Sequence, residues 1–314
     1  MTIFGKTKRG KDVTMISLQA GDLTVRLLSH GARVQDVRLA GVDHSLTVGS
    51  NELADYEGAM HYHGAIVGPI ANRIGNARVR LDGMMYELER NEDGARHLHS
   101  GAQGTHAQVW QVTDRTDSSV TMALDLPDGQ AGLPGNRRII AHFAITAPAT
   151  LTLAITGTTD ATTLMNFANH SYWNMDGSAN WHGHTLRIAA DRYLPIDAAT
   201  CPTGEIADVT DTRMDFRAGP VLGADTPPLD HNFCLSDGPE PLRDVLWLTG
   251  QSGVAMTMAT TAPGMQIFDG RPDHGALAIE AQHWPDAPNI PDFPSIKVQA
   301  GATYRQITSW TFAT

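Results

Sequence analysis

Cysteine is scarce in this chain, because its 314 residues include only Cys201 and Cys234, which have no CxxC spacing. This argues against a disulfide scaffold and against a zinc knuckle, and it favours a reducing compartment, so we expect a cytoplasmic protein. Long apolar runs are missing as well, which excludes a membrane-spanning helix. Residues 1–11 carry four basic side chains, but no apolar stretch of signal-peptide length follows them.

Basic residues are also in short supply. The chain has 23 Lys and Arg against 34 Asp and Glu, a formal net charge of -11. Nucleic acid and acidic lipid surfaces need a surplus of cations, so both are disfavoured as partners. The hydrophobic fraction of 41% is that of an ordinary globular protein. We expect a small-molecule partner and a monomer or homodimer.

Alternation of apolar and polar residues, rather than helical periodicity, dominates the pattern. It is clearest in residues 120–126, 139–145 and 151–155, and Ala147-Pro148-Ala149 predicts a hairpin between the last two. Further strands are predicted at residues 23–27, 79–81, 86–88 and 304–312, and short helices at 52–60 and 242–246. With 30 glycines and 17 prolines between the strands, the pattern predicts an all-β fold. We expect one domain over residues 1–314, a large antiparallel β-sandwich with few short helices.

Two segments carry residues suited to acid–base chemistry. His170 lies among amide and hydroxyl side chains in residues 166–174, a density that suits fixing an imidazole tautomer. Glu280 follows the apolar residues 277–279, so burial is expected to raise its pKa. Asp230 and Arg73 are further candidates. Taken singly, each has an ordinary structural explanation, and only their joint occurrence favours a function.

Other chemistries fit the sequence less well. Three His-x-His pairs, at residues 61–63, 97–99 and 182–184, place two imidazoles on one face of a strand, as a metal site requires. No HExxH motif or cysteine partner supports such a site, so no metal is expected. Ser171 has no GxSxG elbow around it, which disfavours a serine hydrolase. Neither GxxxxGK[ST] nor GxGxxG is present, so no phosphate-binding loop is predicted.

Several ordered segments together resemble the aldose 1-epimerases, also called galactose mutarotases. The resemblance runs from about residue 20 to the C-terminus, and it is carried by residues 68–74, 97–101, 169–174, 229–233, 263–266 and 280–289. It implies a large antiparallel β-sandwich and interconversion of the α and β anomers of a free aldose, without a cofactor.

The resemblance also implies roles for individual residues. Glu280 is expected to be the general base and His170 the general acid. Five others are expected to contact the sugar, namely Asn72, Arg73, His99, Asp230 and Gln266. Proton transfer by a positioned carboxylate and imidazole is the chemistry that opening a cyclic hemiacetal requires.

Departures from the family pattern leave the preferred aldose open. Pro69 replaces a usual arginine, and Trp173 and Trp284 replace common phenylalanines. An indole either stacks on a sugar face or fills the core, and the second is commoner. Two alternative functions stay open: a hexose-6-phosphate epimerase, for which no cationic cluster surrounds the motifs, and a non-catalytic carbohydrate sensor, which would not need a matched acid and base.

Overall fold

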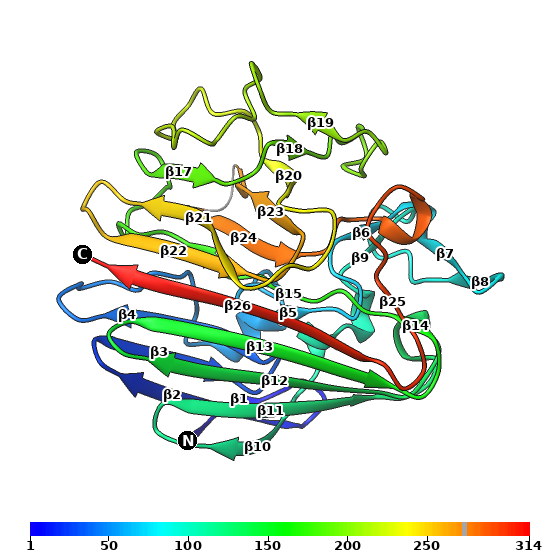
Figure 1. The fold of residues 1–314 in the computed structure, drawn as a ribbon. Helices are drawn as coiled ribbons and strands as arrows, with labels where there is room; N and C mark the ends of the chain where they lie inside the picture. Colours follow the sequence, from blue (N-terminus) through cyan, green and yellow to red (C-terminus); the bar gives the residue numbers. More distant parts are fainter. Residues whose placement is uncertain (272–274) are drawn as a thin grey trace.

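Antiparallel strands dominate the chain, as the alternation predicted, and most of them belong to three sheets (Figure 1). The computed structural model describes residues 1–271 and 275–314. The largest sheet has eight strands, in the order β10 (Gln111–Arg115), β11 (Ser119–Leu126), β12 (Arg137–Thr146), β13 (Thr150–Thr159), β26 (Thr303–Ala313), β22 (Ala255–Thr260), β21 (Arg243–Thr249) and β17 (Thr185–Ile188).

Two smaller sheets accompany it. One has four strands, in the order β1 (Thr2–Lys6), β2 (Asp12–Ala20), β3 (Leu23–Leu28) and β4 (Arg33–Leu39). The other has six, in the order β16 (Tyr172–Trp173), β24 (Leu277–Gln282), β23 (Gly264–Phe268), β20 (Asp230–Cys234), β18 (Arg192–Tyr193) and β19 (Ala207–Asp208).

Short two-stranded pairs and turns complete the described chain. The pairs are β5 (Ile66–Val67) with β15 (Ala168–Asn169), β6 (Arg73–Ile74) with β9 (His97–Leu98), β7 (Arg78–Leu81) with β8 (Met84–Glu87), and β14 (Thr163–Leu164) with β25 (Lys297–Val298). Helical structure consists of α1 (Leu53–Tyr56) and the single turns η1 (Gly75–Ala77), η2 (Gly101–Gln103), η3 (Thr105–Ala107), η4 (Gln130–Gly132) and η5 (Ala287–Asn289). Across residues 1–271 and 275–314, no helix has the length and apolar character that crossing a membrane requires.

One apolar core joins the three sheets. Ile16 of β2, Phe143 of β12, Ile279 of β24 and Trp310 of β26 are fully buried members of the same cluster. The eight-stranded sheet therefore has an inner face covered by both smaller sheets, which is the predicted β-sandwich. Its long strands run side by side across the molecule in Figure 1.

The hairpin predicted at Ala147-Pro148-Ala149 is confirmed. β12 pairs with β13 through ten residues on each strand, with Thr146 opposite Thr150 across the predicted connection. Along β12 the side chains alternate strictly between buried positions and positions that are half-buried or exposed. The turn at Asp82-Gly83 likewise joins β7 to β8, because the left-handed backbone of both residues suits a tight hairpin.

The two helix predictions were largely wrong. Residues 242–246 fall mostly in strand β21, where pairing with β17 and β22 satisfies the backbone and buries Val245 and Leu246. Residues 52–60 form only the four-residue helix α1. Short apolar runs do not distinguish the two structures, and tertiary pairing decided the first case.

Replacing Phe143 with alanine should lower the free energy of unfolding by about 3–5 kcal/mol, because the large cavity left between sheets cannot be refilled. Urea denaturation followed by circular dichroism measures this. His142→Ala is the matched control, since its exposed ring lies on the opposite face of the same strand. It should cost less than about 1 kcal/mol. Equal losses in the two variants would contradict the assigned core.

Candidate active site

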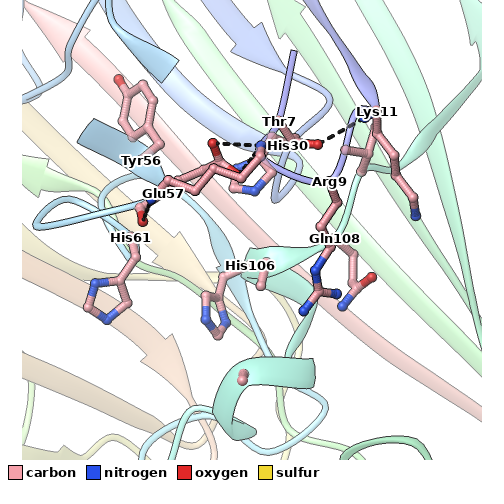
Figure 2. A pocket seen from close by; sticks show the side chains of 13 residues that line it. Thr7, Arg9, Lys11, His30, Tyr56, Glu57, His61, His106 and Gln108 are labelled. Atoms are coloured by element: carbon pink, nitrogen blue, oxygen red, sulfur yellow. Dashed lines mark hydrogen bonds between the residues drawn. The ribbon is translucent and has the colours of Figure 1, made fainter. Parts of the chain in front are cut away.

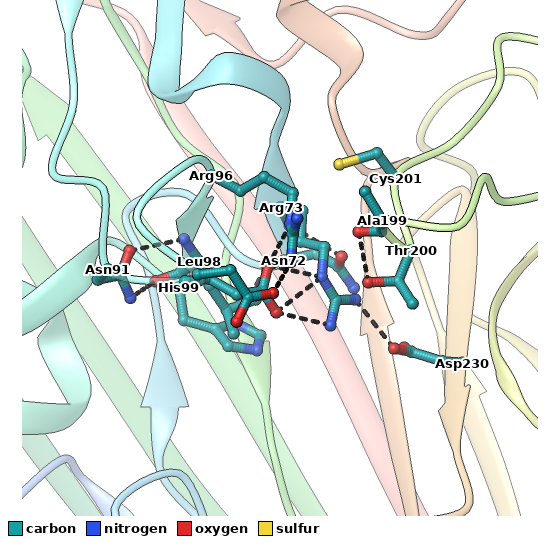
Figure 3. A network of polar contacts seen from close by, with 12 residues as sticks. Asn72, Arg73, Asn91, Arg96, Leu98, His99, Ala199, Thr200, Cys201 and Asp230 are labelled. Carbon is teal, nitrogen blue, oxygen red and sulfur yellow. Dashed lines mark hydrogen bonds and ion pairs between the residues drawn. The ribbon is translucent and has the colours of Figure 1, made fainter.

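A cavity of about 240 Å³ opens where the six-stranded sheet meets the short pairs β5–β15 and β6–β9. It is lined by side chains that are far apart in sequence: Tyr62, His63, Asn72, Arg73, His99, His170, Tyr172, Asp230, Phe268 and Glu280, with Ala59, His61 and Leu98 at its margin. Six of the seven predicted site residues are among them. Figure 3 shows four of these six, Asn72, Arg73, His99 and Asp230, converging from separate segments.

Glu280 lies in the middle of β24, whose six residues are all buried. The strand is paired on one side with β16 and on the other with β23, where Gln266 is opposite Glu280. Burial raises the pKa of Glu280 well above its usual value; the nearby Asp230 charge raises it further and Arg73 opposes the rise. A raised pKa makes the carboxylate a stronger base, as expected of a general base.

His170 contacts this carboxyl group directly, with 3.5 Å between its Nε2 atom and Oε1 of Glu280. The two residues expected to act as base and acid therefore lie next to each other. The backbone of His170 is held at both ends, because its N–H donates to the carbonyl of Ala65 and its own carbonyl accepts from the N–H of Gly64. The ring of Tyr62 stacks against the imidazole, with 5.7 Å between centroids.

Two polar neighbours of His170 hold the backbone of its segment in place. Asn169 donates through Nδ2 to the carbonyl of Gly64, and Ser171 donates through Oγ to Oδ1 of Asn169. They thus tie the segment to the neighbouring backbone. Ser171 is fully buried and lies outside the cavity lining, which agrees with rejecting it as a nucleophile.

His99 presents a defined tautomer to the cavity. Its Nδ1 atom accepts a hydrogen bond from the backbone N–H of Asn72 at 3.0 Å. Burial, then repulsion from His170 and other cationic groups, holds the pKa of His99 well below its usual value, so the ring is neutral. A neutral ring that accepts at Nδ1 carries its proton on Nε2, and His99 is therefore a hydrogen-bond donor.

The same tautomer bears on metal binding. Within residues 1–271 and 275–314, the group of His and acidic side chains close enough to hold an ion is His99, His170 and Glu280, whose ligand atoms lie within 4.8 Å of one another. This group does not contain both members of any His-x-His pair noted in the sequence. A protonated Nε2 on His99 has no lone pair for a metal, so coordination there would require losing the hydrogen bond from Asn72.

Arg73 is held on both sides by carboxylates (Figure 3). Its Nε and Nη2 donate to Glu92 at 2.9–3.1 Å, and Nη1 donates to Oδ2 of Asp230 at 3.0 Å. Burial alone would lower the pKa of Arg73, but the two carboxylates outweigh it and the net direction is upward. Arg96 also donates to Glu92 at 2.9 Å. The guanidinium is thus fixed in place at the cavity wall.

Gln266, the seventh predicted site residue, lies next to the cavity lining and contacts one of its members. It is absent from the cavity lining, and its Nε2 donates to Oδ1 of Asp230 at 2.7 Å from behind. Asp230 is consequently gripped by Arg73 at one oxygen and by Gln266 at the other. The sequence pattern identified Gln266 as a residue near the site, but it did not indicate that Asp230 lies between Gln266 and the cavity.

Sequence reasoning missed Glu92 and the aromatic lining. Glu92 lies in a charged segment, residues 87–96, that resembles any solvated loop, so no signal distinguished it. Tyr62, Tyr172 and Phe268 give the cavity apolar surface, which suits the C–H face of a ring. Trp173 and Trp284 do not contribute, because both fill the core: Trp173 packs on Trp310, and the indole of Trp284 donates to the carbonyl of Pro263.

Comparisons with known proteins agree with one another. The family described as aldose 1-epimerase matches residues 14–311. Galactose mutarotase of Bos taurus is 32% identical, over 99% of this chain and 97% of that protein. Aldose 1-epimerase of Escherichia coli K12 is 29% identical, over 92% of each chain. The crystal structure of the GalM/aldose epimerase homologue from C. elegans superimposes with a TM-score of 0.88 at 28% identity, covering 96% of this chain and 99% of that one.

The ring nitrogens of His99 should show the assigned tautomer directly. In ¹⁵N-histidine-labelled protein, Nδ1 should resonate as an unprotonated nitrogen and Nε2 as a protonated one, without titrating between pH 5 and 8. Long-range ¹H–¹⁵N spectra measure this, and His99→Gln assigns the signals. Protonation of Nδ1, or a midpoint near 6.5, would contradict the donor role.

Proposed function

The chain belongs to the aldose 1-epimerase family and is an isomerase, and we propose that Glu280 and His170 carry the two proton transfers by which it interconverts the α and β anomers of a free aldose. One observation carries the proposal: a buried carboxyl group and an imidazole in contact at 3.5 Å within a cavity rich in hydrogen-bonding groups. The family needs a base and an acid on one hemiacetal, and these two residues supply both.

Ring opening breaks the bond between the anomeric carbon and the ring oxygen. Glu280 removes the proton of the anomeric hydroxyl, the electrons form the carbonyl, and His170 delivers a proton to the departing ring oxygen. Rotation about the adjacent carbon–carbon bond then presents the other carbonyl face. Closure follows with the two residues in reversed roles and yields the opposite anomer.

The proton count of the pair stays constant throughout. One proton starts on His170 and passes to the ring oxygen, while the proton from the anomeric hydroxyl passes to Glu280. Closure returns both, so no exchange with solvent is needed during a turnover. The pair therefore works when it holds one proton in total, and its two ionisations belong to the pair and not to either residue.

The remaining lining residues suit binding. The Nε2–H of His99 is a fixed donor to a sugar oxygen, and the carboxylate of Asp230 accepts from hydroxyl groups. Arg73 offers its guanidinium edge to a hydroxyl while Glu92 holds it still. Asn72 has its Oδ1 occupied by the N–H of Arg73, which leaves its Nδ2 as the group for substrate.

A free aldose fits this cavity better than a sugar phosphate. Arg73 is the one Lys or Arg of the described lining, and two carboxylates already neutralise it. A dianionic phosphate group would find no uncompensated cation there. Galactose is the first aldose to test, since the mammalian relatives are galactose mutarotases. Polarimetry of fresh α-galactose, glucose, xylose and arabinose ranks the substrates, and no acceleration with any of them would favour a carbohydrate sensor.

The proposal extends to the chain as a whole. We place residues 1–314 in one domain, because the apolar core draws on all three sheets. We place it in the cytoplasm, where the two buried free thiols, Cys201 and Cys234, suit reducing conditions.

Glu280→Gln and His170→Asn should each lower kcat for anomerisation by at least about 10²-fold, because each removes one proton-transfer group while keeping its approximate shape. Polarimetry at several sugar concentrations separates kcat from KM. Glu240→Gln, at an exposed position, is the matched control and should be unaffected. Near wild-type turnover in either active-site variant, with folding verified by circular dichroism, would refute its assignment.

Asp230→Asn should move the acidic limb of kcat/KM to lower pH. Burial is the larger cause of the raised pKa of Glu280, and the charge of Asp230 adds to it. Removing that charge lowers the pKa, so the carboxylate stays ionised in more acidic solution. A pH–rate profile by polarimetry measures the limb, and Asp237→Asn at an exposed site is the control. A limb that stays in place or moves upward would contradict this coupling.

A further inference from the structure

A second cavity, also of about 240 Å³, lies beside the sugar site and shares His61 with it (Figure 2). Its lining comes from the turn between β1 and β2, from the segments around His30 and Tyr56, and from the turn η3 that holds His106. None of the residues given a role in anomerisation lines it. The function proposed above leaves this cavity unexplained.

Positive charge is concentrated around this cavity. Lys8, Arg9 and Lys11 line it, against the single carboxylate of Glu57, in a chain whose net charge is -11. The carboxylate of Glu57 is occupied by the backbone N–H of Lys8, at 2.9 and 3.1 Å. Among the described residues, no carboxylate lies within ion-pair distance of Arg9 or Lys11. The lining therefore keeps a surplus of two positive charges.

Two nearly buried histidines contribute to the lining of the cavity. His30 and His106 both line it although they are only 4% and 5% exposed. The Nδ1 atom of each is buried and lacks a hydrogen-bond partner within the described part of the chain. Burial lowers the pKa of His30 to about 4 and that of His106 well below its usual value, so both rings are neutral hydrogen-bonding groups. Buried polar atoms are normally paired, and exceptions call for a reason.

Aromatic rings separate the two cavities. Tyr62 stands between them, with its ring centroid 4.8 Å from that of His106 and 5.7 Å from that of His170. His61 lies 3.9 Å from Tyr62 and 6.2 Å from His106 by the same measure. The second cavity is thus a neighbour of the reaction site with its own lining.

We propose that this cavity is a second binding site, for a small molecule bearing a phosphate group. Two uncompensated cations match the charge of a phosphate monoester, which is close to -2 near neutral pH. The guanidinium of Arg9 and the ammonium of Lys11 supply charge-assisted donors, and the imidazoles of His30 and His106 supply neutral partners for further oxygens. The cavity has the volume of the sugar site, so it has room for a ligand of monosaccharide size.

Isothermal titration calorimetry with two probes tests the site, at constant ionic strength and with saturating galactose present. The probes are inorganic phosphate and α-glucose 1-phosphate, whose blocked anomeric oxygen prevents it from being a substrate for ring opening. The double variant R9Q/K11Q should bind either probe at least about tenfold more weakly than wild type. The control K6Q/R115Q makes the same change in charge outside the cavity and should bind normally.

A spectroscopic readout locates the bound molecule. On addition of the probe, the ring ¹⁵N signals of His30 and His106 should shift, while that of the exposed His142 should not. Binding of the sugar phosphate alone would identify a phosphate ester as the ligand, and equal binding of both probes would identify the phosphate group itself. No saturable binding of either probe, or equal affinity in R9Q/K11Q and wild type, would overturn the proposal. Neither measurement depends on turnover.

Discussion

The reaction site depends on one constraint, which is that the carboxyl group of Glu280 is kept out of water. An ionised carboxylate in such a place is unfavourable by several kcal/mol unless other groups compensate it. The positive charge of Arg73 compensates this carboxylate only in part. Arg73 lowers the pKa of Glu280, whereas burial and the charge of Asp230 raise it, and the net shift is upward. β24 pairs with β23 from Ala278 to Gln282 and with β16 at Leu277 and Ala278, so the backbone that carries Glu280 is held within the sheet.

The segments facing Glu280 are held just as firmly, although they are not long strands. Asn72 and His99 both have positive φ angles, at 65° and 50°, which cost of order 1–3 kcal/mol for residues with side chains. The pairing of β6 with β9 and the bond from Asn72 to His99 fix these residues in that conformation. The ion pairs of Arg73 with Glu92 and Asp230 fix the guanidinium group in the same way. Proton transfer between groups at hydrogen-bond range needs such positional accuracy.

Structural features that depend on neighbouring residues could be predicted from the sequence. Features that depend on contacts between distant residues mostly could not. The β12–β13 hairpin followed from alternation around Pro148, since neighbouring strands need only a turn between them. Glu280 and His170 were paired only through the resemblance to a family, because nothing in the 109 intervening residues encodes their distance. Glu92 had no local signal at all, and the sequence did not reveal that Gln266 donates to Asp230. The segment at 242–246 became a strand because β17 and β22 flank it.

The position of β26 in the eight-stranded sheet has a consequence for how the chain is made. Residues 303–313 insert between β13 and β22, so a strand late in the sequence joins two parts of a sheet whose strands are synthesised before it. Until then the edge of β13 has ten residues of open backbone, a template for pairing with another nascent chain. The sheet closes only after residues 303–313 have been synthesised and have paired with both neighbouring strands.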